Sequence, residues 1–488
     1  MYNHRYFLQT VRKNRGLIVF ILYSFFFIFT IGLAFLYFRI LHKAFLRYDG
    51  ITEYVTVLTY WGTYLRNLVK SIFLSGKIVL PQWDFSIGYG ADILTTMHWY
   101  VIGDPLNLLS IFFKPERTIV FYNFLVVFRM YLCGLTFLFY CRRRSFSSFS
   151  SLCGAFVYVF SGYALYCAVR HTFFIMPMVY LPLLYIGVDD VLEKRNPALF
   201  IISVFLACIT NYYFFYVLSL LMFLYAVIRF FGERKKIAVA DFLISGATIL
   251  GFYLVGLAMA AAIFLPNVSG FLTSNRVNIK PIIPFLYRPV HYGKLLLSAV
   301  SPNVISSYTF LGFASLVMPA AIVCFFQKDA FSRQLKVLIG IYLVFLCFPF
   351  FGHVFNGFNY VTNRWSFAIA FVAGVVAAHI FPKLGNMTAK ELRFSTLIPL
   401  ILSVAVFIAS VFSGEVRRQF LVPYIVLVLM TILLYGINKW GRQGTSPKAR
   451  FKVELALFAS VIFSVVINAN VRYSPKLINY LEDHLLVT

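Results

Sequence analysis

Acidic residues are scarce in this chain of 488 residues. It contains 17 Asp and Glu against 43 Lys and Arg, and charged residues of all kinds make up only 12% of it. Soluble globular domains carry about 25% charged residues, so the composition excludes a soluble enzyme, a disordered protein and a fibrous repeat. Hydrophobic residues make up 61% of the chain, and the mean hydropathy is +0.83. We therefore predict an all-α polytopic membrane protein.

Paired cysteines are also absent. All seven cysteines lie in or beside apolar stretches, and no two of them form a CxxC pair. The sequence therefore indicates neither a disulfide framework nor a zinc site.

Thirteen apolar runs predict thirteen transmembrane helices of about 20 residues each. The first runs from Leu17 to about Leu41; it is too long for the core of a signal peptide and lacks a small-residue cleavage site, so we interpret it as an uncleaved span. The other runs centre on 118–140, 152–169, 172–190, 198–210, 212–230, 238–262, 310–326, 335–350, 365–382, 394–413, 420–437 and 453–469.

The basic residues predict the orientation. With the N-terminus inside, the inner connections hold 24 Lys and Arg, and the outer ones hold 10 once the long stretch 39–117 is left out. Short cytosolic connections are enriched in Lys and Arg. We therefore expect a multi-pass protein of the bacterial plasma membrane with a cytosolic N-terminus. The orientation in the membrane accounts for most of the net charge of +26, so no nucleic-acid partner is needed to explain it.

Two outer connections are much longer than the rest. The predicted order is a cytosolic N-terminus with the first span (1–41), a first outer loop (42–117), spans two to seven (118–263), a second outer loop (264–309), spans eight to thirteen (310–470) and an outer tail (471–488). Because binding residues concentrate on loops, we expect the outer face to carry the function. Apolar residues at helical spacing over 50–75 predict an amphipathic helix in the outer interface.

The first candidate for chemistry is Asp49, directly after the first span. At the outer interface its carboxylate suits a general base that takes a proton from a sugar or polyol hydroxyl. Glu53, one helical turn later, could share that role. The alternative is that Asp49 caps the interfacial helix, since Asp is a favoured N-cap residue.

Four further polar residues of the first loop lie among aromatic residues. Carboxylates accept hydrogen bonds from hydroxyls and aromatic rings cover sugar faces, so this composition favours a sugar-binding pocket. A role in folding the loop is the alternative for each of them. The residues are Asp84, Asp92, His98 and Asp104. Their spacing matches no metal-ligand motif.

Cations at the outer membrane boundary form a third set. Arginine binds phosphate through a planar fork of donors, so these side chains suit the phosphate of a lipid-linked substrate. Anchoring to phospholipid headgroups is the alternative. The set comprises Arg170, His171, Arg276, Arg288, His291 and Arg364. Arg129 differs because it lies inside span two, where we expect either a buried ion pair with a first-loop carboxylate or a direct substrate contact.

Four motifs of this chain resemble those of the bacterial YfhO-like membrane proteins. They are RYDG at 47–50, WDFSIGYGAD at 83–92 with GDPLN at 103–107, the stretch RHTFFIMPMVYLPLLYIGVDDVLEK at 170–194, and above all FNGFNYVTNRWSF at 355–367. That family resembles the GT-C class of integral-membrane glycosyltransferases, some of which decorate teichoic acids with sugars from polyprenyl phosphate.

The resemblance implies a GT-C-like fold and a function. The expected reaction transfers a sugar from a polyprenyl-phosphate donor to a cell-envelope glycopolymer or glycolipid on the outer face, with no cofactor and no obligatory metal. It implies Asp49 as the catalytic base, and it places Arg364 in the outer site with three asparagines, Asn356, Asn359 and Asn363. Larger relatives continue into an outer soluble domain, so we expect whatever that domain adds to be absent here or supplied by a partner protein.

Two other classes of function fit the same sequence. A flippase or other transporter of a lipid-linked sugar would use many spans and Arg129, but transporters concentrate polar groups near the middle of the membrane. A non-catalytic scaffold for envelope assembly would use the aromatic outer loops for docking. The sequence leaves the sugar and the acceptor open.

Overall fold

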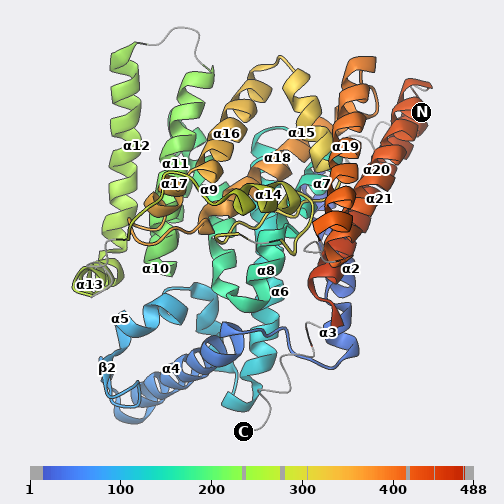
Figure 1. Ribbon diagram of the computed structural model, residues 1–488. Helices are drawn as coiled ribbons and strands as arrows, with labels where there is room; N and C mark the ends of the chain where they lie inside the picture. The colour runs from blue at the N-terminus through green and yellow to red at the C-terminus, as the bar shows by residue number, and fades with distance from the viewer. Residues whose placement is uncertain are drawn as a thin grey trace, which may run out of the picture.

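The computed structural model describes residues 15–233, 238–274, 281–304, 306–413, 418–443, 446–475 and 478. Within these residues the protein is an all-α polytopic membrane protein (Figure 1). The described strands form one short antiparallel pair, β1 (Trp83–Asp84) with β2 (Ala91–Asp92), in which Trp83 faces Asp92 and Asp84 faces Ala91.

The helices follow one another with short connections through most of the chain. The first part contains α2 (Arg15–Ala34), α3 (Leu36–Ile40), a π-helical turn (Gly50–Tyr54), α4 (Val55–Ser75), α5 (Ile93–Met97), a second π-helical turn (His98–Ile102), two 3₁₀ helices (Pro105–Phe112 and Pro115–Arg117) and α6 (Thr118–Arg143). The middle part contains α7 (Ser148–Val159), α8 (Gly162–Arg170), a 3₁₀ turn (Thr172–Ile175), α9 (Met176–Leu192), α10 (Ala198–Thr210), α11 (Tyr212–Glu233), α12 (Val239–Met259) and α13 (Ala261–Leu272). The last part contains α14 (Pro289–Ser298), α15 (Val317–Phe326), α16 (Ala330–Cys347), α17 (Pro349–Val354), a 3₁₀ turn (Arg364–Ser366), α18 (Phe367–Leu384), α19 (Ala389–Ser413), α20 (Arg418–Gln443) and α21 (Pro447–Arg472).

Every predicted span coincides with a helix, but the count of thirteen is not confirmed. Ten described helical segments are long and apolar enough to cross a membrane, and α7 with α8 forms an eleventh that is bent by 50°. The other two, α10 and α15, have 13 and 10 residues. At 1.5 Å per residue they reach about 20 and 15 Å, which is short of the ~30 Å hydrocarbon core.

The centre of the bundle is formed by α6, α7, α9 and α18. Buried residues fill 94% of the segment containing α9 but only 11% of α12, which stands at one edge of the bundle (Figure 1). Small residues let α7 and α18 approach closely: a Cβ on Gly154 would lie 2.5 Å from the carbonyl oxygen of Gly374. Close backbone contact through small residues is a common way of packing helices in membranes.

The segment 42–117 covers one end of the bundle, where α4 lies obliquely across the ends of the long helices (Figure 1). The predicted amphipathic helix is present, although its first turn is π-helical. Leu58 and Trp61 are buried while Phe73 is exposed. Arg66 fastens α4 by donating hydrogen bonds to the carbonyl oxygens of Ser110 and Phe113.

Candidate functional site

Asp49 lies at this same end of the bundle, beside the loop that joins α8 to α9. Its carboxylate oxygens lie 3.3 Å from Nδ1 of His171 and 3.9 Å from a guanidinium nitrogen of Arg170. The Tyr54 hydroxyl is 2.9 Å from the same Nδ1. Asp49 is 34% exposed, so its carboxylate is accessible from outside the protein.

The structure does not support a capping role for Asp49. Its side chain makes no hydrogen bond to the helical turn that it precedes. The carboxylate instead faces two side chains of a distant part of the sequence. A residue placed in this way is available for chemistry and is not needed to start the helix.

Three backbone features bring Asp49 to this position. The amide of Arg47 donates to the carbonyl oxygen of Val169 at 3.0 Å, which fixes residues 47–50 against the end of α8. A Cβ at Gly50 would lie 2.8 Å from the Tyr122 hydroxyl and 3.0 Å from the carbonyl oxygen of Val169, so the close approach requires glycine. Tyr48 adopts φ of 46°, a left-handed conformation that a bulky side chain rarely takes.

Arg364 lies near His171, because both side chains contact the ring of Phe174. Its guanidinium carbon is 5.0 Å from the centre of the Tyr308 ring and 5.5 Å from that of Phe174, and the Phe174 ring stacks on His171 at 4.6 Å. One of its nitrogens donates to the Tyr360 hydroxyl at 2.9 Å, while its Nε has no partner among the described residues. The structure thus brings Asp49 and Arg364 close to the adjacent residues Arg170 and His171, although these three positions lie far apart in the sequence.

Burial and two neighbouring arginines determine the protonation state of His171. Burial, followed by the charges of Arg170 and Arg364, lowers the pKa of His171 to about 3. The imidazole is therefore neutral at neutral pH and adds no third cation to the site. Depending on its tautomer, Nδ1 donates to Asp49 or accepts from Tyr54.

Two of the three asparagines of the 355–367 motif make hydrogen bonds within the motif, and the third bonds to a residue far away in the sequence. Asn356 donates to the carbonyl oxygen of Tyr360, and Asn359 accepts from the Tyr360 amide. Asn363 is fully buried and donates to the Thr309 hydroxyl at 2.9 Å. These bonds shape the loop that presents Arg364.

The other acidic residues expected in the first loop have separate surroundings. Glu53 is exposed. Asp84 accepts hydrogen bonds from the Tyr60 hydroxyl and from the amide of Ser86, which lower its pKa. Asp92 caps α5 by accepting from the amide and hydroxyl of Thr95. The structure gives Asp84 and Asp92 partners that fold the loop and does not bring them to Asp49.

His98 and Asp104 are buried beneath the loop. His98 contacts the carbonyl oxygen of Ile209 through Nε2 at 2.7 Å. Asp104 forms an ion pair with Arg129 at 2.6 Å, and both side chains are almost fully buried. Arg129 also donates to Asn107 and to Thr172, so the prediction that it pairs with a first-loop carboxylate is confirmed.

The structure describes two of the three remaining predicted cations. Arg276 lies outside the described residues, so its expected role in substrate binding stays a prediction. Arg288 is exposed before α14, and His291 is buried with Nδ1 2.8 Å from the Ser306 hydroxyl.

Sequence reasoning missed two cations near the site, Arg47 and Arg472. Arg47 lies in the RYDG motif, two residues before Asp49. Arg472 follows the last predicted span and is partly buried beside Tyr166, with its guanidinium carbon 4.7 Å from the ring centre. A basic residue at a helix end is common in membrane proteins, so no signal in the sequence distinguished it.

Comparison with known proteins identifies the family. The family model described as "Bacterial membrane protein YfhO" matches residues 49–485, which include Asp49, His171 and Arg364. The chain belongs to the YfhO family. It is similar to the "Uncharacterized protein YfhO" of Bacillus subtilis (strain 168), with 26% identity over 309 residues that cover 61% of this chain and 32% of the relative. The chain thus spans about a third of that YfhO protein, and no solved structure matches it.

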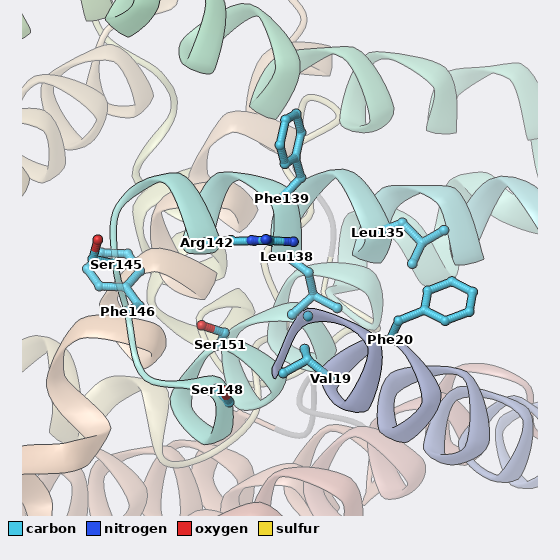
Figure 2. Close-up of a pocket in the computed structure, with 11 residues that line it drawn as sticks. Val19, Phe20, Leu135, Leu138, Phe139, Arg142, Ser145, Phe146, Ser148 and Ser151 are labelled. Atoms are coloured by element: carbon cyan, nitrogen blue, oxygen red, sulfur yellow. The ribbon is translucent and has the colours of Figure 1, made fainter. Parts of the chain in front are cut away.

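A pocket of about 430 Å³ opens at the other end of α6. It lies between α2, α6 and α7, where Arg142 and three serines face apolar side chains (Figure 2). Its lining includes none of the residues expected to act in this YfhO family member. Among the described residues, no group of three or more His, Cys, Asp or Glu is arranged to hold a metal.

Proposed function

We propose that this protein is a glycosyltransferase that uses a polyprenyl-phosphate-linked sugar. The acceptor is a teichoic-acid-like glycopolymer or a glycolipid on the outer face of the plasma membrane. The observation that carries the proposal is the position of Asp49, a reachable carboxylate beside His171 and Arg170, with Arg364 close by.

The arrangement provides the two functions that such a transfer requires. Asp49 takes the proton of the acceptor hydroxyl while that oxygen forms a bond to the anomeric carbon. The bond between the anomeric carbon and the phosphate oxygen breaks, and its electron pair leaves with the lipid monophosphate. Arg170 and Arg364 offer donors to the phosphate, whose negative charge grows as the bond breaks.

The surroundings of Arg129 weigh against the transport alternative. Transporters hold their substrates with polar groups near the middle of the membrane. Arg129 is the candidate for such a group, but its two terminal nitrogens already donate hydrogen bonds to Asp104, Asn107 and Thr172. The polar side chains at the Asp49 end remain the better substrate site.

A reconstituted transfer assay tests the proposal. Purified protein in liposomes is given a polyprenyl-phosphate hexose with a labelled sugar and an oligo(glycerol phosphate) or glycolipid acceptor. We expect label in the acceptor with the wild-type protein and not with Asp49→Asn. Movement of the intact donor across the bilayer without transfer would show a flippase, and neither activity across a panel of hexoses would favour a scaffold.

A further inference from the structure

Four arginines gather at the Asp49 end of the bundle around a small group of tyrosines. The guanidinium carbons of Arg170 and Arg472 lie 5.3 and 4.7 Å from the centre of the Tyr166 ring. Arg47 lies 6.0 Å from the ring of Tyr473. The fourth arginine is Arg364, whose guanidinium carbon lies 5.0 Å from the centre of the Tyr308 ring. In the part of the chain that the structure describes, the pair between Arg170 and Asp49 is the only ion pair that any of these four arginines makes. The region therefore has a surplus of positive charge.

Arg47 is the most exceptional member of this group. Its side chain is 2% exposed, and its Nε and one terminal nitrogen have no hydrogen-bond partner among the described residues. Its guanidinium carbon lies 6.0 Å from the centres of the Phe38 and Tyr473 rings. Cation–π contacts stabilise a cation only modestly, whereas an unpaired buried charge is strongly destabilising. The rings alone do not balance the burial of this cation.

Arg472 adds to the imbalance. Burial and the charge of Arg472 lower the pKa of Arg47 to about 10, so the two cations destabilise one another. Arg472 donates one hydrogen bond, to the side-chain oxygen of Asn303 at 3.3 Å, and makes no ion pair within the described residues. A bound anion would remove the repulsion between Arg47 and Arg472 and would accept hydrogen bonds from the unpaired N–H groups of Arg47.

We propose that Arg47 and Arg472 form a phosphate-binding subsite beside Asp49. Arginine pairs are suited to phosphate because each planar guanidinium offers two parallel donors to its oxygens. The phosphate ester that fits here belongs either to a polyprenyl phosphate or to a polyol-phosphate polymer. The subsite is distinct from the Arg170 and Arg364 contacts described above. The subsite would bind phosphate whether or not Asp49 acts as a base.

Ligand-induced stabilisation of the purified protein in neutral detergent tests this subsite. The probes are a polyprenyl monophosphate, an oligo(glycerol phosphate), inorganic phosphate and phosphatidylglycerol, with the neutral polyprenol as the uncharged control. We expect a polyprenyl monophosphate or an oligo(glycerol phosphate) to raise Tm at lower concentration than the other probes. The more effective of the two identifies the source of the phosphate.

The variants Arg47→Met and Arg472→Met should each weaken binding of that probe at least tenfold. Arg117→Met, which removes an exposed arginine outside the cluster just before α6, should bind as the wild type does. Asp49→Asn should also keep the Tm shift, even where it abolishes transfer. That result would separate the subsite from the proposed reaction.

Stability without ligand provides a second measurement. Because Arg47 is an uncompensated cation, Arg47→Met should unfold at the same temperature as the wild type or a higher one in the absence of phosphate. A lower Tm together with wild-type phosphate affinity would show that Arg47 has a purely structural role and would overturn the proposal. If Arg47→Met does not fold, Arg47→Lys and Arg472→Lys, which keep the charge but lose the fork, must bind the probe more weakly. Wild-type affinity in both Lys variants, or no stabilisation by any phosphate probe, would also overturn it.

Discussion

Asp49 is the residue on which the proposed chemistry depends most directly. We predict that Asp49→Asn lowers sugar transfer by about 10²–10⁴-fold, the usual contribution of general acid–base catalysis. Asn has nearly the same shape but cannot take the proton. Because the Asp49 side chain makes no capping hydrogen bond, neither Asn nor Ala at this position should lose stability through a lost cap. Initial rates in proteoliposomes and thermal unfolding of the same preparations measure both effects.

Glu53 provides the matched control for this prediction. It is an exposed carboxylate one turn further along the same segment. Glu53→Gln should transfer sugar at close to the wild-type rate. A fully active Asp49→Asn with an inactive Glu53→Gln would move the base to Glu53 and contradict the assignment.

Arg364 carries the second prediction. Its guanidinium lies among the rings of Phe174, Tyr308 and Tyr360 and donates to the Tyr360 hydroxyl. Lysine keeps the charge but neither stacks as a plane nor offers a fork to phosphate. Arg364→Lys should therefore lower the rate of transfer at least tenfold while expression stays at the wild-type level. A substitution of the exposed Arg117, Arg117→Lys, serves as the control, and wild-type kinetics in Arg364→Lys would show that Arg364 only anchors the loop.

Backbone strain marks the same region of the molecule. Tyr48 and Tyr308 both have positive φ, 46° and 59°, and Ser307 has 49°. Bulky residues in this conformation cost free energy and are often retained at functional sites. No sequence pattern predicted these positions, because Tyr has no preference for the left-handed region. Sequence motifs could therefore indicate Asp49 and Arg364, but not the strained turns that lie beside them.

At the scale of elements, the first loop is joined to the bundle by a buried ion pair. Asp104 precedes a 3₁₀ helix and caps it through the amide of Leu106, while Arg129 comes from the middle of α6. We predict that Arg129→Met destabilises the protein by about 3–5 kcal/mol because it leaves a buried carboxylate without its partner. Equilibrium unfolding of the purified protein measures this loss.

The double variant tests the cause of that loss. Arg129→Met combined with Asp104→Asn removes both charges and keeps an amide oxygen for the cap, so it should recover part of the stability. Arg117→Met, which changes an exposed arginine just before α6, should have little effect. A double variant no more stable than Arg129→Met alone would mean that packing, and not the unpaired charge, explains the loss.

Hydropathy predicted the helices better than it predicted their lengths. The apolar run 310–326 was expected to span, but its helix α15 begins only at Val317. Residues 310–316 are not helical, and the carbonyl oxygens of Leu311 and Gly312 accept hydrogen bonds from the amide of Gly162. Apolar composition is the same for a span and for a buried irregular segment, so only tertiary contacts could distinguish them.

At the scale of the whole molecule, the structure separates two polar ends. One end holds Asp49, His171 and Arg364. The other holds the pair Asp189 and Asp190 at the end of α9. These carboxylates bind Arg143 of α6, Arg229 of α11 and Arg195 of the connection that follows α9. The excess of Lys and Arg predicts that this second end is cytosolic.

The predicted orientation can be measured with single cysteines in a background lacking the native seven. Gln82 is exposed at the Asp49 end, and Lys439 is exposed near the opposite end of α20. Lys439 is a better position than its neighbour Asn438, which is buried. In intact cells, a membrane-impermeant maleimide should label Gln82→Cys within minutes and leave Lys439→Cys unlabelled until the membrane is permeabilised. The reverse pattern would place Asp49 in the cytosol, out of reach of an acceptor on the outer face, and would contradict both the orientation and the proposed reaction.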